Sequence, residues 1–202
     1  MKKIIKKKRI MANHMRTNLT IEGSKKLMGF LEEKGKVVDE RNKEDQYLAF
    51  VGAFIPEMKN DRGWFTDNVG AKWCYHEDFY NDDSIAEVIL ISAWYYPNTL
   101  IENLFKICSE IDEDVQIYGT FEDESYNPVG GFAINKYGFE EDEECDLEYP
   151  DEDVYLDADG EVDYDEYDVA MEEFYEEVYE TKDLCQQNCL DVLNELKEEA
   201  TT

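Results

Sequence analysis

Two residues near the middle of the chain carry side chains that often form catalytic and metal sites. Cys74 and His76 lie two positions apart in a run typical of a strand, so both are expected to point to one face of a sheet. A thiolate nucleophile or a zinc site needs further partners. The sequence offers none at fitting spacing, because the only other histidine is His14 and no two cysteines form a CxxC pair. We therefore expect no catalytic residue, no cofactor and no zinc site.

The strongest chemical signal is negative charge. Residues 151–180 hold fifteen carboxylates and no Lys or Arg, and six aromatic residues are spaced between them. Three uses of such a segment compete: a disordered solvating tail, a calcium loop, or a surface that contacts a strongly basic partner.

A calcium loop has a spacing that can be tested. With Gly160 at position six of an EF-hand loop, carboxylates fall at positions three, five, nine and twelve. Position one should also be Asp, but Tyr155 stands there, and Pro150 interrupts the helix expected before the loop. The sequence thus predicts only a weak calcium candidate. Its ligands would be Asp157, Asp159, Asp163 and Glu166.

A helical period returns after the acidic run. From Tyr164 onwards, apolar residues recur at steps of three or four, which predicts one amphipathic helix over residues 164–199, or two shorter ones. Carboxylates about 5–6 Å apart cover the opposite face, comparable to the phosphate spacing of about 7 Å along a DNA strand. We expect the apolar stripe to pack on the domain or on a partner, and the acidic face to contact a basic protein. The predicted contact residues are Asp163, Tyr164, Asp165, Glu166, Asp168, Glu172, Glu173, Tyr175, Glu176, Glu177 and Glu180.

The overall composition limits the kind of partner. The 202 residues include 50 acidic and 20 basic side chains, a net charge of -30, while 43% hydrophobic residues suffice for a core. Such charge disfavours direct binding to duplex DNA or an anionic membrane, and no run approaches the roughly 20 apolar residues of a membrane span. Five cysteines without CxxC pairs are typical of reduced thiols. We expect a cytoplasmic protein without membrane contact.

The elements that would position these side chains lie upstream of the acidic run. Alternating or apolar runs predict strands in residues 16–23, 70–80, 84–94, 114–122 and 132–138. Helical spacing predicts helices in residues 24–35 and 98–111, whereas residues 47–57 resemble a short strand and residues 58–68 a loop. The order strand, helix, strand, strand, helix, strand, with an extra edge strand, predicts an α+β fold. We expect a ferredoxin-like split βαβ antiparallel sheet with helices on one face.

Charge and pattern divide the chain into four predicted segments. They are a basic N-terminal extension (1–11), a ferredoxin-like domain (12–138), an acidic linker (139–163) and an amphipathic acidic helix (164–199).

Four motifs, in order, resemble a known family. They are "MANHMRTNLTIEG" (11–23), "NVGAKWCY" (68–75), "SAWYYPNTLIENL" (92–104) and "GTFEDESYNPVGGF" (119–132). Together they are similar to the YubB-like, ferredoxin-like domain of phage and plasmid proteins. The resemblance implies the fold and a mobile-element accessory protein, and it implies no activity; "WYYP" carries fewer prolines than that family usually shows. We also expect Trp73 and Trp94 to fill the core.

Two functional hypotheses follow. The first is a non-enzymatic phage or plasmid accessory protein in the host cytoplasm. Its acidic, DNA-mimic-like surface would bind and inhibit a basic nucleic-acid-handling host protein, such as a nuclease of a defence system, in the manner of anti-CRISPR or anti-restriction proteins. The alternative is a replication or structural accessory protein whose sheet and basic N-terminal run bind nucleic acid. In that case the acidic tail would regulate binding in cis.

Overall fold

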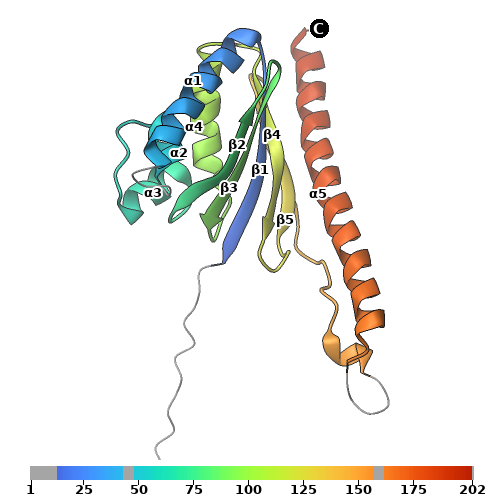
Figure 1. The fold of residues 1–202 in the computed structure, drawn as a ribbon. Helices are drawn as coiled ribbons and strands as arrows, with labels where there is room; N and C mark the ends of the chain where they lie inside the picture. The colour runs from blue at the N-terminus through green and yellow to red at the C-terminus, as the bar shows by residue number, and fades with distance from the viewer. Residues whose placement is uncertain (1–12, 43–47, 157–161, 202) are drawn as a thin grey trace, which may run out of the picture.

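The computed structural model describes residues 13–42, 48–156 and 162–201. They form an α+β protein built on a six-stranded antiparallel sheet of order β2-β3-β1-β4-β5-β6 (Figure 1). The strands are β1 (His14–Glu22), β2 (Cys74–Asn81), β3 (Ile85–Ala93), β4 (Gln116–Asp123), β5 (Val129–Asn135) and β6 (Gly138–Glu144). The helices are α1 (Lys25–Asn42), α2 (Ala49–Phe54), α3 (Arg62–Val69), α4 (Asn98–Ser109) and α5 (Tyr164–Thr201), with a 3-10 turn η1 (Glu152–Tyr155). The α+β class predicted from the sequence is confirmed.

The central strand β1 shows why the sheet forms. Its residues alternate strictly between buried and partly exposed, as expected where one face of a strand packs on a core. Leu19 and Ile21 face the helices, while Asn18 and Thr20 face the other side of the sheet. β3 and β4 flank β1 on its two sides, so β1 carries hydrogen bonds along both edges.

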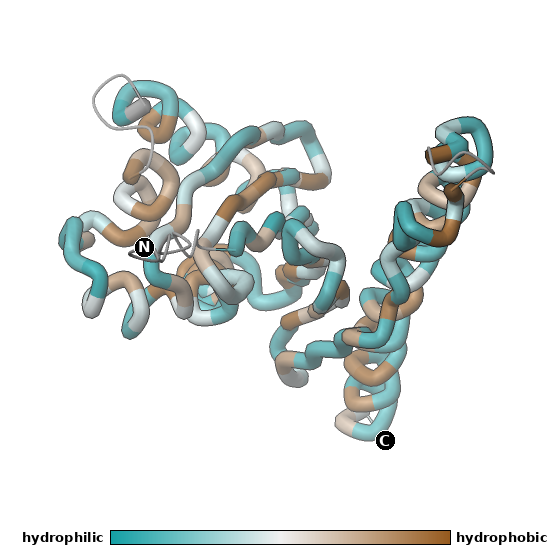
Figure 2. Tube along the Cα trace, turned by 90° about the horizontal axis from the view of Figure 1, so that it is seen from below, coloured by the Kyte–Doolittle hydropathy of each residue, from teal (hydrophilic) through white to brown (hydrophobic). Residues whose placement is uncertain are grey.

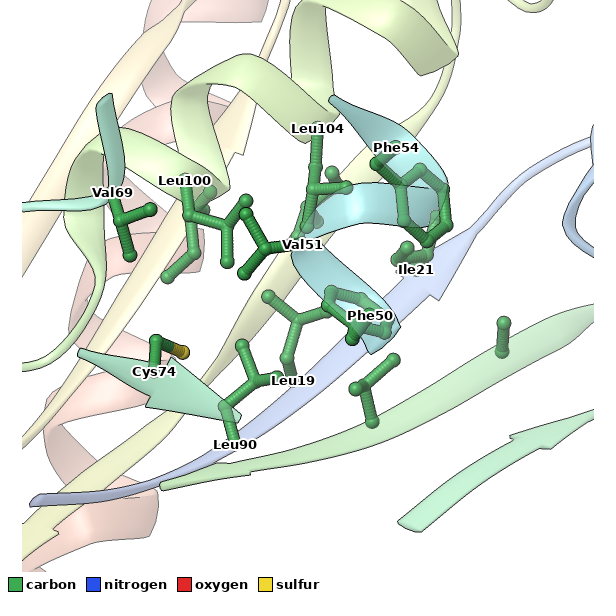
Figure 3. Packing of buried hydrophobic residues seen from close by; sticks show 14 of the residues in the cluster. Leu19, Ile21, Phe50, Val51, Phe54, Val69, Cys74, Leu90, Leu100 and Leu104 are labelled. Atoms are coloured by element: carbon green, nitrogen blue, oxygen red, sulfur yellow. The ribbon is translucent and has the colours of Figure 1, made fainter. Parts of the chain in front are cut away.

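The main core lies between the sheet and α1 to α4, which all cover the same face (Figure 1). Leu19 of β1 and Leu90 of β3 meet Phe50 and Val51 of α2, while Leu100 of α4 closes the cluster (Figure 3). These side chains are almost completely removed from water, so the hydrophobic effect holds this layer together.

Two segments differ from the sequence prediction. Residues 47–57 were expected to form a short strand, yet Ala49–Phe54 is a helix. All six of its residues are buried, so its sequence is apolar throughout and shows no period that would distinguish a helix from a strand. Residues 58–68 were expected to form a loop, but Asp61 caps α3 by accepting a hydrogen bond from the Trp64 backbone N–H at 2.9 Å. Gly70 ends that helix at φ 87°.

Part of the predicted acidic linker is also regular. Residues 138–144 form the edge strand β6, although five of them are acidic. Asp142 accepts a hydrogen bond from Asn188 of α5 at 2.8 Å, and Glu141 accepts one from the Tyr96 hydroxyl on the opposite face. Contacts to both layers thus anchor the strand, and its exposed charges discourage pairing with another chain.

The long helix α5 lies over part of the face of the sheet that α1 to α4 leave open (Figure 1). It packs on β5 and β6 and more lightly on β4. From the sequence, the apolar stripe of α5 could pack either on the domain or on a partner protein. In the structure it packs on the domain. Helices therefore lie on both faces of the complete sheet, and the prediction of helices on one face describes only α1 to α4.

Candidate partner interface on the acidic helix

The first half of α5 is attached through a small apolar cluster of its own. Met171, Phe174 and Val178 recur at helical spacing and pack with Val129 of β5. Tyr126, in the loop between β4 and β5, meets Phe174 edge to face with ring centroids 5.6 Å apart. The predicted helical period of apolar residues is observed in this half of α5, and the buried residues fix which face of the helix points to solvent.

The second half of α5 lies directly on the sheet. Cys189 and Leu193 pack on Ala133 of β5, and the Cys189 thiol lies 3.6 Å from the Gly131 carbonyl oxygen. A side chain at Gly131 would overlap the backbone of the helix, so this glycine permits the close approach. Cys185 and Cys189 are both buried at this contact between α5 and the sheet.

One ion pair crosses the seam between the two halves. Lys182 of α5 is only 3% exposed, and its ammonium binds the Glu122 carboxylate of β4. The same ammonium lies 4.5 Å from the ring centroid of Tyr179. Lys182 is the first basic residue after the acidic run, but its charge is buried and paired, so it does not offset the exposed carboxylates of the helix.

The acidic face itself is presented to solvent. Every residue predicted to contact a partner is exposed: Asp163, Tyr164, Asp165, Glu166, Asp168, Glu172, Glu173, Tyr175, Glu176, Glu177 and Glu180. Two of them also have local roles. Asp163 caps α5 by accepting from the backbone N–H groups of Asp165 and Glu166 at 3.2 and 3.3 Å, and the Tyr175 ring lies edge-on against Tyr126.

A rigid helix makes this face different from an acidic tail. Carboxylates held on one packed helix keep fixed spacings, whereas a disordered segment would average them over many conformations. Figure 2 shows α5 as a straight rod at the side of the domain, with hydrophilic and hydrophobic residues alternating along it. The exposed carboxylates form a fixed array of hydrogen-bond acceptors, bordered by tyrosines. This array suits binding to a surface rich in Arg and Lys.

The calcium hypothesis stays a prediction. Asp157 and Asp159 lie outside the described residues, Asp163 already accepts two backbone hydrogen bonds, and Glu166 is exposed on the first turn of α5. Within the described ranges, no group of three or more His, Cys, Asp or Glu side chains is placed to hold a metal ion.

The pair Cys74 and His76 lies in the core-facing layer of β2. Both point to the same side of the strand, where His76 stacks on Phe50 with ring centroids 6.0 Å apart. Burial raises the pKa of the Cys74 thiol and lowers the pKa of His76. A buried thiol is a poor nucleophile because the thiolate is the reactive form.

The other thiols lead to a prediction about reactivity. Burial raises the pKa of Cys108 and Cys189 to about 12 and that of Cys185 to about 11. Cys145 alone is exposed, although partial desolvation and then its carboxylate neighbours raise its pKa as well. We expect a thiol reagent at pH 8 to label one of the five cysteines of the native chain within minutes, and all five after unfolding. Mass spectrometry identifies the site, and rapid labelling of Cys74 would contradict the buried, inert assignment.

Sequence reasoning misplaced two tryptophans and missed two contacts of the acidic helix. Trp94 was expected in the core but is 43% exposed; it has φ 77°, and the Lys72 ammonium lies 3.4 Å from its ring centroid. Trp73 is half-buried rather than central. The Lys182–Glu122 pair and the position of Tyr126 depend on contacts between residues about 50 to 60 positions apart in the chain, which no local pattern indicates.

Comparison with protein-family models, curated proteins and solved structures finds no match to this chain. In the part of the chain that the structure describes, no helix combines the length and apolar character needed to cross a membrane.

Proposed function

We propose that this chain is a non-enzymatic accessory protein of a phage or plasmid that binds and inhibits a basic, nucleic-acid-handling host protein. The class of partner is a nuclease of a host defence system, and the mode is mimicry of DNA by the acidic face of α5. The observation that carries the proposal is the division of α5: its apolar stripe is buried on the sheet while every acidic residue of its first half is exposed. A fixed acidic face attracts a basic groove and repels nucleic acid itself.

Within this proposal the domain is a ferredoxin-like member of the YubB-like family. The strand order β2-β3-β1-β4 and the helices α1 and α4 after β1 and β3 support the split βαβ pattern. The motifs of the resemblance also meet in space. Gly70 packs against Asn98 and Thr99 at the start of α4, and Lys72 lies over Trp94.

Reversing the charge of the acidic face tests the proposal. Lysine at Glu172, Glu173, Glu176 and Glu177 keeps the helix propensity and leaves the buried stripe intact, but it inverts the local field. We expect binding of the partner to weaken about 100-fold at low salt. The reason is that four attractive contacts with a basic surface become repulsive. A tagged pull-down from bacterial lysate identifies the partner, and titration of the purified partner measures the loss.

The matched control reverses the same number of charges elsewhere. Glu32, Glu33, Asp39 and Glu40 are exposed on α1, on the opposite face of the sheet. Lysine at these four positions changes the net charge equally and should leave binding within about threefold. Equal loss in both variants would mean that net charge, rather than the α5 face, attracts the partner. Full binding and full inhibition by the α5 variant would reject the proposal.

A second candidate function rests on a different surface. Trp94 and Tyr95, 43% and 68% exposed, follow β3 beside Lys72, and exposed aromatic rings near a cation can stack on single-stranded bases. This arrangement suits the alternative of a nucleic-acid-associated accessory protein regulated by its acidic helix. Binding of single-stranded DNA that strengthens in the α5 charge-reversal variant and disappears in Trp94→Ala would favour it over mimicry.

A further inference from the structure

Half of one sheet face has no helix over it. α5 covers β5, β6 and part of β4, whereas no helix of the described residues packs over β1, β2 and β3 on this side (Figure 1). The register places Arg16 beside Ile91 and Tyr75, and Asn18 beside Ile89, all facing away from the main core. We call this uncovered half of the sheet, beside α5, the open face.

A cavity of about 300 Å³ lies at the end of the open face nearest His14. This volume is at the lower limit of ligand pockets, so it fits a single side chain better than a cofactor. Two tyrosines from different elements line it, Tyr75 of β2 and Tyr126 of the loop between β4 and β5. Its acidic lining comes from Glu77, Asp123, Glu122 and Glu124.

The cavity already holds one guanidinium. The Arg16 side chain lines it and donates a hydrogen bond to the Glu77 carboxylate at 2.6 Å. Glu122 is paired with Lys182, and the buried Asp123 accepts from the Ser125 backbone N–H at 2.8 Å. Even with Arg16 and Lys182 counted, negative charge exceeds positive charge around the cavity. The lining therefore favours a second cation over an anion.

The two tyrosine rings are held in place by their neighbours. Tyr75 stacks on Trp73 with centroids 5.8 Å apart and an interplanar angle of 18°. Tyr126 has φ 58°, a backbone conformation uncommon for a residue with a side chain, and meets Tyr175 edge to face at 5.6 Å. Rigid aromatic rings beside carboxylates suit a planar guanidinium better than a compact ammonium, because the guanidinium both stacks and forms paired hydrogen bonds.

The cavity is continuous with the acidic helix. Tyr126 lines the cavity and contacts Tyr175, while the Lys182 ammonium joins Glu122 of the cavity to the Tyr179 ring of α5. A basic segment bound to the α5 face can therefore reach the cavity without leaving the negative surface.

We propose that the open face binds an arginine-bearing basic segment of the partner, with one guanidinium entering the cavity lined by Tyr75, Tyr126, Glu77 and Glu124. This inference rests on the proposed function, which it deepens by naming the side chain that anchors the partner. Charge complementarity selects the occupant, and the two tyrosines select arginine over lysine.

The test uses the full-length chain and synthetic hexa-arginine and hexa-lysine peptides as probes. We expect nuclear magnetic resonance to show saturable shifts of Tyr75, Ile91 and Tyr126 with hexa-arginine, and roughly tenfold weaker binding of hexa-lysine. Glu77→Lys places a second cation in the cavity and should weaken hexa-arginine binding about tenfold. Glu40→Lys, on the opposite face, changes the net charge equally and should reduce it less than twofold.

The outcomes separate this inference from the proposed function. Shifts confined to α5, with equal affinity for both peptides and no effect of Glu77→Lys, would overturn the arginine cavity. Partner binding lost in the α5 charge-reversal variant but unchanged in Glu77→Lys would also overturn it and leave mimicry standing. Shifts of the cavity residues that respond to Glu77→Lys, in a chain whose α5 variant binds the partner normally, would support the arginine cavity and reject the mimicry.

Discussion

Replacing Gly131 with alanine will lower the free energy of unfolding by about 3 kcal/mol, at the upper end of the usual cost of overpacking. A Cβ at this position would overlap the backbone N and Cα of Gln186 and lie 2.7 Å from the Cys185 carbonyl carbon. Backbone atoms of a helix cannot turn aside as a side chain can, so α5 must move away from β5. The move separates Cys189 and Leu193 from Ala133. Chemical denaturation of the purified chain measures the loss.

Two glycines give matched controls for this substitution. A Cβ at Gly138 would meet the Leu193 side chain at 3.5 Å, an ordinary contact, so Gly138→Ala should change stability by less than about 1 kcal/mol. A Cβ at Gly29, within α1, meets nothing within 4 Å, and Gly29→Ala should stabilise the protein by roughly 0.5–1 kcal/mol. Equal stability of Gly131→Ala and the wild type would show that α5 does not lie against β5 in solution.

The same substitution connects stability to function. If α5 leaves the sheet, its carboxylates lose their fixed position relative to the sheet and Tyr175 loses its contact with Tyr126. A partner that recognises the array as a rigid surface will then bind Gly131→Ala more weakly, although no charge has changed. An acidic segment that acts only through its charge would bind equally in both forms.

The sequence predicted the elements whose patterns are local. The strict alternation of β1 and the helical period of the first half of α5 are set by neighbours within one element, so their buried faces could be predicted. The acidic face of α5 follows from the same period, because carboxylates opposite the apolar stripe must point to solvent. The helix α2 could not be predicted in this way, since a run buried on all sides shows no period.

The rest of the candidate interface depends on contacts between distant residues. Asp61 and Gly63 resemble turn residues, and only the hydrogen bond from Trp64 shows that Asp61 begins a helix. The strand β6 forms in an acidic stretch because Tyr96 and Asn188 bind its carboxylates from opposite faces. From the sequence alone, Lys182 resembles the other polar residues of α5. Only its contact with Glu122 of β4 shows that it is buried and paired.

Replacing Lys182 with methionine will lower the free energy of unfolding by about 3 kcal/mol. Methionine keeps most of the volume of the side chain but leaves the Glu122 carboxylate without its ion-pair partner at the seam of α5. Removing one partner of a buried ion pair costs about 3–5 kcal/mol. Because the Glu122 side chain is 19% exposed to water, we expect a loss at the lower end of this range. Chemical denaturation at constant pH and salt measures this loss of stability. Lys197→Met is the control, because Lys197 is exposed on the same helix and its replacement should cost less than about 0.5 kcal/mol.

The double variant Lys182→Met with Glu122→Gln separates the ion pair from packing. Removing both charges avoids the stranded carboxylate, so stability should return to within about 1 kcal/mol of the wild type. A double variant as unstable as Lys182→Met would mean that Lys182 acts through its alkyl chain and its contact with Tyr179 rather than through Glu122. If the ion pair governs docking, Lys182, the only buried lysine among the described residues, has a specific role. It allows an acidic helix to lie against the acidic end of β4, while the exposed carboxylates of the helix remain free to meet the cations of another protein.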